Sequence, residues 1–164
     1  MHHAMRRHLQ ALTEKEAYEF LEVASHLVLS FVDLDNSPYC VPVNFVLENR
    51  TIYVHGAPMG TRSLLIRHNP KISACAVIQD HIVPEKLTSY FKSVALQGTA
   101  AIVTDYDEKL MALISLAKKY APEFVQQGIQ EAKAQLQYVE VVKISIDEIQ
   151  AKQSIELVKK AEKP

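Results

Sequence analysis

The sequence has no tryptophan, only four glycines and two cysteines in 164 residues, and no long apolar run. Its longest stretches without Asp, Glu, Lys or Arg, 36–47 and 93–104, hold twelve residues each, whereas a membrane-spanning helix needs about 20 apolar residues. Charge of one sign is also lacking, because 18 basic and 19 acidic residues leave a formal charge of −1. Binding to nucleic acid or a membrane surface is therefore not expected, and an anionic ligand needs a local site.

The first eight residues, MHHAMRRH, contain basic side chains but are followed neither by an apolar segment nor by a cleavage site of small residues. The sequence therefore predicts a cytoplasmic protein. Cys40 and Cys75 lie inside apolar runs without CxxC spacing. Buried free thiols are expected at both positions, with neither a disulfide nor a metal pair.

The length fits one domain, here 1–164, with an N-terminal arm over 1–12 and a C-terminal tail over 153–164. Helices are expected over 14–24, over 61–69 and within 107–137. Six segments are rich in β-branched and aromatic residues: Leu27–Val32, Tyr39–Leu47, Thr51–His55, Ile72–Ile78, Ser93–Val103 and Tyr138–Ile146. Short turns between them predict a strand-dominated α+β domain around a six-stranded antiparallel β-barrel with peripheral helices.

The segment 55–63, with the sequence HGAPMGTRS, stands between a predicted strand and a predicted helix. Gly56 and Gly60 allow backbone N–H groups to approach a ligand, and the helix start offers free donors and a positive dipole end. Thr61 and Arg62 add a hydroxyl and a guanidinium. This is the layout of a phosphate site; the alternative is a simple turn with Arg62 in water.

Two further segments are candidates for contact with a ligand. Pro42 lies inside the segment 38–45, where it removes a ladder donor and indicates an edge strand or a backbone that faces a planar ring. Gly98 lies inside the predicted strand Ser93–Val103, which begins shortly after Tyr90. A glycine inside a strand indicates a bulge or a close approach. An amphipathic strand would explain the second segment equally well.

Other chemistries find little support in the sequence. No HExxH, paired Cys/His spacing or GxSxG is present, which argues against metal and serine hydrolases. The acidic residues of the segment 105–109 read as a helix cap rather than an acid/base pair.

Taken together and in order, these segments resemble the pyridoxamine 5'-phosphate oxidase-like family of FMN-binding split barrels, most of all its 5-nitroimidazole-resistance (Nim)-like branch. The segments that carry the resemblance are MRR at 5–7, PYCVPVNF at 38–45, IYVHGA at 52–57 with GTR at 60–62, NPKI at 69–72, YFKSV at 90–94 with GTA at 98–100, and DEK at 107–109 with AL at 112–113.

The resemblance implies a homodimer with FMN at the subunit interface. Its implied cofactor contacts are Val41, Pro42, Val43, Asn44, His55, Gly56, Ala57, Gly60, Thr61, Arg62, Tyr90 and Ser93. The segment 41–44 would face the flavin ring, Thr61 and Arg62 the phosphate, and Tyr90 and Ser93 the flavin held mainly by the other subunit. His55 is the implied catalytic or substrate-facing residue.

The resemblance further implies an FMN-dependent oxidoreductase that passes electrons from NAD(P)H or a protein donor to a small molecule such as a nitro compound. The basic strand motif of the vitamin-B6 oxidases is missing from 39–44, which argues against oxidation of pyridoxamine phosphate. Two alternatives stay open: a flavin-storage or flavin-sensing module without turnover, and a haem-binding split barrel with His55 or His81 as ligand.

Overall fold

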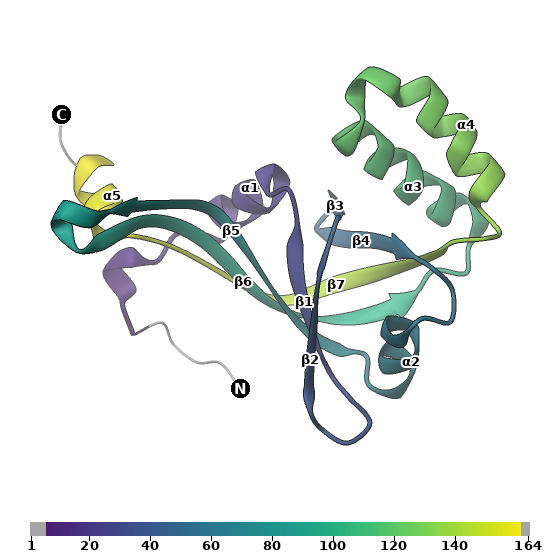
Figure 1. Ribbon diagram of the computed structural model, residues 1–164, viewed down its shortest axis with the longest axis horizontal. Helices are drawn as coiled ribbons and strands as arrows, with labels where there is room; N and C mark the ends of the chain where they lie inside the picture. The colour runs from purple at the N-terminus through teal and green to yellow at the C-terminus, as the bar shows by residue number, and fades with distance from the viewer. Residues whose placement is uncertain (1–5, 162–164) are drawn as a thin grey trace.

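The computed structural model describes residues 6–161, and these form one antiparallel sheet with helices around it (Figure 1). The strands are β1 (Leu27–Val32), β2 (Pro38–Val43), β3 (Val46–Glu48), β4 (Thr51–Gly56), β5 (Lys71–Val83), β6 (Thr88–Ile102) and β7 (Glu140–Gln153). The α-helices are α1 (Glu14–Val23), α2 (Thr61–His68), α3 (Tyr106–Tyr120), α4 (Val125–Gln135) and α5 (Ile155–Ala161). Short 3-10 turns cover His8–Gln10, Pro84–Lys86 and Pro122–Phe124.

The strand order is β2-β1-β5-β6-β7-β4-β3, so the two edge strands of the sheet follow each other in the chain. Only Asn44 and Phe45 separate them, and the sheet curls so that its edges meet at this corner. This arrangement confirms the predicted strand-dominated α+β split barrel with peripheral helices.

The predicted number of six strands is wrong, because the segment Tyr39–Leu47 forms two strands rather than one. The cause is Phe45, whose backbone leaves the ladder. Its N–H donates to the Tyr120 hydroxyl at 2.9 Å, and the same hydroxyl lies 2.9 Å from the Phe45 carbonyl and 2.7 Å from that of Ser25. Tyr120, the last residue of α3, therefore takes over the hydrogen bonds that a strand neighbour would supply.

Strands β5, β6 and β7 are longer than predicted, and the β5–β6 hairpin reaches far beyond the barrel (Figure 1). The range expected as a C-terminal tail contains the end of β7 and helix α5, with Ser154 only 2% exposed between them. In the expected N-terminal arm, Ala11 bridges to Lys152. Met5 of the resembling MRR segment and residues 162–164 of the tail lie outside the described residues.

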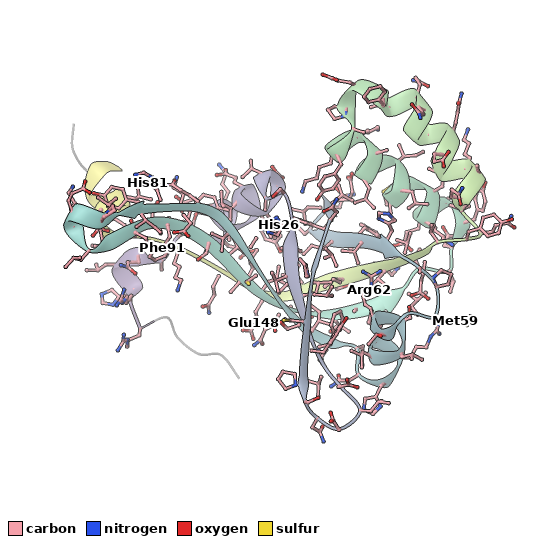
Figure 2. The ribbon with its side chains drawn as sticks, in the orientation of Figure 1. His26, Met59, Arg62, His81, Phe91 and Glu148 are labelled. Atoms are coloured by element: carbon pink, nitrogen blue, oxygen red, sulfur yellow. The ribbon has the colours of Figure 1, made fainter. Side chains whose placement is uncertain are left out.

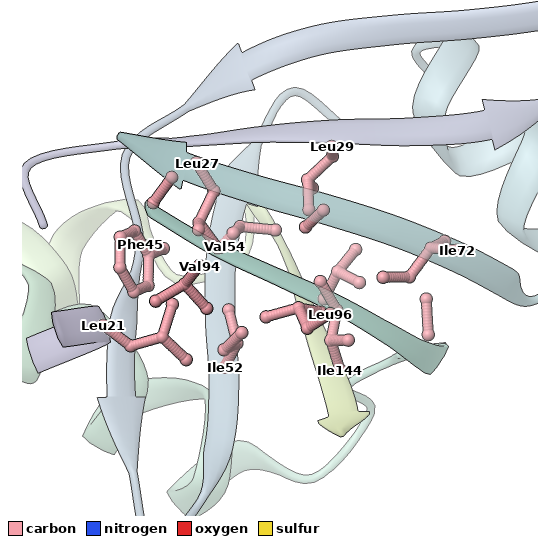
Figure 3. Packing of buried hydrophobic residues seen from close by; sticks show 14 of the residues in the cluster. Leu21, Leu27, Leu29, Phe45, Ile52, Val54, Ile72, Val94, Leu96 and Ile144 are labelled. Carbon is pink, nitrogen blue, oxygen red and sulfur yellow. The ribbon is translucent and has the colours of Figure 1, made fainter. Parts of the chain in front are cut away.

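The main core fills the interior of the curled sheet, as Figure 3 shows. Its largest fully buried side chains include Phe45, Leu21, Leu27, Leu29, Ile52 and Ile144. A second apolar cluster lies beneath α3 and α4 and contains Tyr53, Leu113, Leu116, Leu136 and Val141. Strands β4 and β7 lie between these two apolar clusters and contribute residues to both. This packing fixes the position of the segment that follows β4.

Local sequence signals explain the helix ends. Thr13 and Glu16 form the reciprocal capping box at the start of α1. Asp105 accepts the N–H of Glu108 at the start of α3, so its predicted capping role is confirmed. Glu108 itself accepts hydrogen bonds from the Tyr53 hydroxyl at 2.9 Å and from Lys143 Nζ at 2.9 Å, which ties α3 to β4 and β7.

The Tyr53–Glu108 contact predicts a pH effect on folding. Burial, together with the hydrogen bond to Glu108, raises the pKa of Tyr53 to about 12, above the ordinary value of about 10. Between these pH values the unfolded chain loses the phenol proton and the folded chain keeps it, so the free energy of unfolding should fall as pH rises from about 10 to about 12. In urea melts across this range, Tyr53→Phe should make the decline shallower than in the wild type; identical slopes would contradict the assignment.

Both cysteines are free, as predicted, but both are exposed, so their predicted burial is wrong. In β5, Ile72, Ala74 and Ala76 point into the core, which leaves Cys75 on the outer face. Cys40 lies on β2 opposite Ser30 of β1. No helix within residues 6–161 is long and apolar enough to cross a membrane.

Candidate functional site

The segment between β4 and α2 forms the centre of the candidate site. Strand β4 ends at Gly56, the chain turns through Met59 with a left-handed φ of 58°, and α2 begins at Thr61. Gly60 is the N-cap, and no side chain caps the helix. The first backbone N–H groups of α2 therefore remain available to an anion.

Arg62 folds back from the first turn of α2 onto the end of β4 (Figure 2). Its guanidinium occupies the space where a side chain on Gly56 would lie, so the absence of a Cβ at Gly56 makes room for it. Arg62 Nε is buried and has no hydrogen-bond partner among the described residues. Burial lowers the pKa of Arg62, and the nearby charge of Glu140 opposes that shift. An unpaired buried guanidinium donor is costly unless a ligand accepts from it.

Glu140, at the start of β7, is a buried carboxylate behind Arg62 and is 7% exposed. Its Oε1 accepts from the hydroxyl of Ser63, and its Oε2 lies 3.5 Å from a guanidinium nitrogen of Arg67. Ser63 and Arg67 thus satisfy Glu140 and leave Arg62 Nε unpaired. Glu140 was not among the predicted site residues. Its signal in the sequence is an acidic residue at the start of an apolar strand, and in the structure it pairs with Gly56 of β4.

His55 precedes Gly56 on β4 and lies close enough to Arg62 to feel its charge. Partial burial of the ring and the positive charge of Arg62 both lower the pKa of His55. Both effects therefore favour the neutral imidazole over the imidazolium. A neutral imidazole can accept a proton on one nitrogen and donate from the other.

His55 also lines a cavity of about 340 Å³ beneath the α3–α4 hairpin. Asn44, at the corner between β2 and β3, lines the same cavity, as does Tyr120. The structure therefore brings Asn44 and His55 together with the segment 56–62, although Asn44 belongs to a different part of the chain.

The rest of the segment 41–44 lies on the edge strand β2, as Pro42 predicted. Val41 and Val43 pack against the core, whereas Pro42 is exposed. Within the described residues β2 pairs only with β1, so its second backbone edge faces away from the sheet. Ala57 lies in the exposed turn after β4.

Tyr90 and Ser93 are not brought to Arg62 in the same chain. Both lie on β6, where Tyr90 pairs with His81 near the tip of the long hairpin. Figure 2 shows His81 near the tip of the hairpin, away from Arg62 in the barrel. The Tyr90 hydroxyl accepts from Lys86 Nζ at 3.0 Å, and Ser93 pairs with Val77.

In chemical terms, the groups around Arg62 could hold a phosphate monoester through backbone N–H groups, a hydroxyl and a guanidinium. Among residues 6–161, no three His, Cys, Asp or Glu side chains gather in a way that could hold a metal ion. The groups around Arg62 therefore offer hydrogen-bond donors and positive charge to an anionic ligand.

The chain matches a known family over most of its length. The family described as pyridoxamine 5'-phosphate oxidase matches residues 13–153. No curated protein matches the chain in sequence.

Solved structures show the same fold at low identity. A candidate 5-nitroimidazole antibiotic resistance protein from Bacteroides thetaiotaomicron is 20% identical with a TM-score of 0.70, over 93% of this chain and 96% of that one. A flavocytochrome from Azotobacter vinelandii is 20% identical with a TM-score of 0.75, over 93% and 72%. An FAD- and haem-binding protein from Mycobacterium smegmatis is 15% identical with a TM-score of 0.75, over 94% and 80%.

Proposed function

Since the chain belongs to the pyridoxamine 5'-phosphate oxidase family, we propose that it is an FMN-binding flavoprotein that reduces a small molecule. The observation that carries this proposal is the position of Arg62. Its buried Nε has no partner among residues 6–161, and it lies beside a helix start that no described side chain caps. A phosphate monoester, the terminal group of FMN, would supply both the missing acceptor and the negative charge that the helix start favours.

In this proposal the phosphate site is formed by the turn after β4 and the first residues of α2. Gly60 and Thr61 present backbone N–H groups, and the Thr61 hydroxyl and the Arg62 guanidinium add donors to the same anion. Glu140 keeps Ser63 and Arg67 engaged behind the site. Gly56 and Ala57 allow the backbone to pass close to the ligand.

The flavin ring would lie along the free edge of β2, against the backbone of Val41, Pro42 and Val43 and the side chain of Asn44. When bound, FMN would supply the hydride and electron transfer that protein side chains cannot perform. The residues of the chain would fix the plane of the ring and exclude water from one face. His55, whose neutral form is favoured, is the candidate to hold or donate a proton at the substrate.

The functional unit in this proposal is a homodimer. The outer face of β1, β5 and β6 carries small uncharged residues at successive outward positions: Ser30, Ser73, Cys75, Val77, Ser93, Ala95 and Gln97. Such a face suits contact with a second copy. The same contact would let Tyr90 and Ser93 of β6 reach the flavin that is held mainly by the partner. Light scattering should then report twice the chain mass of 18.5 kDa.

The electron donor in this proposal is NAD(P)H or a protein, and the acceptor is a small molecule of nitroaromatic type. Pyridoxamine phosphate is disfavoured, because Tyr39, Cys40 and the following residues to Asn44 provide no cation for a substrate phosphate.

Haem binding is the second candidate, because two of the neighbouring folds are described as a flavocytochrome and an FAD- and haem-binding protein. In this chain His81, on the exposed β5–β6 hairpin beside Tyr90, is the available ligand distant from Arg62.

The visible spectrum of freshly purified protein, with mass identification of the released chromophore, tests the proposal. We expect flavin bands and FMN on release. Colourless protein that does not take up added FMN would contradict it, released FAD would correct the cofactor, and a haem spectrum would favour the second candidate. Anaerobic reduction with NADH followed by a nitroaromatic compound then separates an enzyme from a storage module, because only an enzyme reoxidises its flavin with the acceptor.

A further inference from the structure

The cavity beneath the α3–α4 hairpin has no role in holding the phosphate, yet it shares His55 with that site. His55 feels the charge of Arg62, and it lines the cavity together with Asn44, whereas Arg62 is not among the lining residues. A ligand in the cavity would therefore lie directly beside any flavin held by β2 and Arg62. This position is where a molecule that exchanges electrons with the flavin must bind.

The cavity suits a small ring compound. Its volume of about 340 Å³ lies at the lower end of the range for small-molecule pockets, roughly 300–1,000 Å³. The inner wall is apolar and consists of Leu113, Leu116, Ala117, Ala132 and Val139. Gly128 lets α4 approach α3 closely, because a Cβ there would lie 2.6 Å from that of Ala117. The cavity roof is therefore formed by two helices held in tight contact.

The polar groups of the cavity carry one formal charge. Glu131 on α4 is the single charged residue among those that line it, and it is exposed at the rim, with Gln135 one helical turn further along. His55, on the opposite wall, contributes no positive charge when its ring is neutral. No cation is among the residues that line the cavity, and the charge of Arg62, which reaches His55, would be offset by the flavin phosphate in the proposed complex. Lys119 on α3 does not line the cavity, and its Nζ lies 3.8 Å from the centroid of the Phe45 ring. A carboxylate or phosphate in this cavity would therefore meet repulsion from Glu131, whereas an amidinium or amide would not.

We propose that this cavity is the acceptor site and that Glu131 makes it select uncharged or cationic planar ring compounds over anionic ones. The inference rests on the proposed flavin function, because the flavin defines the reacting side of the cavity. It narrows the substrate class to unphosphorylated, non-carboxylate rings. It also assigns Glu131 a part in specificity that does not involve the chemical step.

Three probes of matched shape test the charge preference: benzamidine, benzamide and benzoate. Their dissociation constants are measured by ligand-observed NMR on the FMN-loaded dimer, without turnover. We expect benzamidine and benzamide to bind at least tenfold more tightly than benzoate. Glu131→Gln should remove most of the difference between benzamidine and benzoate, whereas Glu123→Gln, an exposed residue outside the cavity lining, should preserve it.

A second pair of variants tests the location. Gln135→Trp places a large side chain at the rim without altering the core, and should weaken all three probes at least tenfold. Gln130→Trp, exposed on the opposite face of α4, should leave them unchanged. Equal binding of benzoate and benzamidine in the wild type, or no effect of Gln135→Trp, would overturn the inference.

Failure of the flavin proposal has a different signature. In that case FMN would not bind, while the probes would keep their charge preference on the unloaded protein. Bound FMN together with probes that ignore Glu131 and Gln135 would refute the cavity assignment alone.

Discussion

Arg62→Ala should weaken FMN binding by roughly 10- to 150-fold, equivalent to about 1.5–3 kcal/mol for the loss of a charge-assisted hydrogen bond. The expectation follows from the unpartnered, buried Nε of Arg62 and from its place at the uncapped start of α2. Fluorescence titration of FMN against the apoprotein measures the effect directly. Arg62→Lys should recover only part of the affinity, because an ammonium lacks the planar fork of a guanidinium.

Gly56→Ala offers an independent test of the same geometry. A methyl group on residue 56 would collide with the Arg62 guanidinium, and the flexible arginine side chain would have to move aside. FMN affinity should therefore fall while the free energy of unfolding changes little. Fluorescence titration measures the affinity and urea denaturation the stability; an unchanged FMN affinity would contradict the contact between Arg62 and the end of β4.

A control must show that the loss of FMN affinity in Arg62→Ala comes from the lost contact and not merely from the removal of one positive charge from the protein. Arg50→Ala removes one positive charge from an exposed residue that pairs with Glu14, on the surface near α1. It should leave FMN affinity within twofold of the wild type. Equal affinities of wild type and Arg62→Ala would show that the guanidinium does not bind the phosphate.

The strand, turn and helix around Arg62 were predictable because their signals are local. A strand of β-branched residues, two glycines and a helix start follow one another within a dozen positions, and the structure keeps that order from Thr51 to His68. The capping box of α1 and the cap at Asp105 were readable for the same reason, because each depends on side chains three residues apart.

The corner at Asn44–Phe45 and the role of Glu140 were not predictable, because their partners lie far away in the sequence. The Tyr120 hydroxyl that ends β2 is 75 residues from Phe45, and Ser63 is 77 residues from Glu140. The prediction that Cys75 is buried was wrong for another reason. Small apolar residues occupy both faces of β5, so alternation does not reveal which face is buried.

Gly98 combines a local signal in the sequence with a partner that lies far away in the chain. A glycine inside a strand indicated a bulge or a close approach, and the structure shows both. The register between β6 and β7 shifts between Gln97 and Gly98. A Cβ on Gly98 would lie 2.6 Å from the backbone carbonyl oxygen of Ser145 and 2.9 Å from a methyl carbon of Ile144.

Gly98→Ala should therefore destabilise the fold by about 1–3 kcal/mol, the usual cost of overpacking a filled interior. The neighbouring atom is backbone oxygen in the central β6–β7 ladder, which cannot rotate away as the Arg62 side chain can at Gly56. Urea denaturation followed by circular dichroism measures the change. Gln130→Ala, on the exposed face of α4 and outside the proposed dimer face, should stay within about 0.5 kcal/mol of the wild type. If Gly98→Ala proved as stable as Gln130→Ala, β6 and β7 would have to lie farther apart at this point than the structure places them.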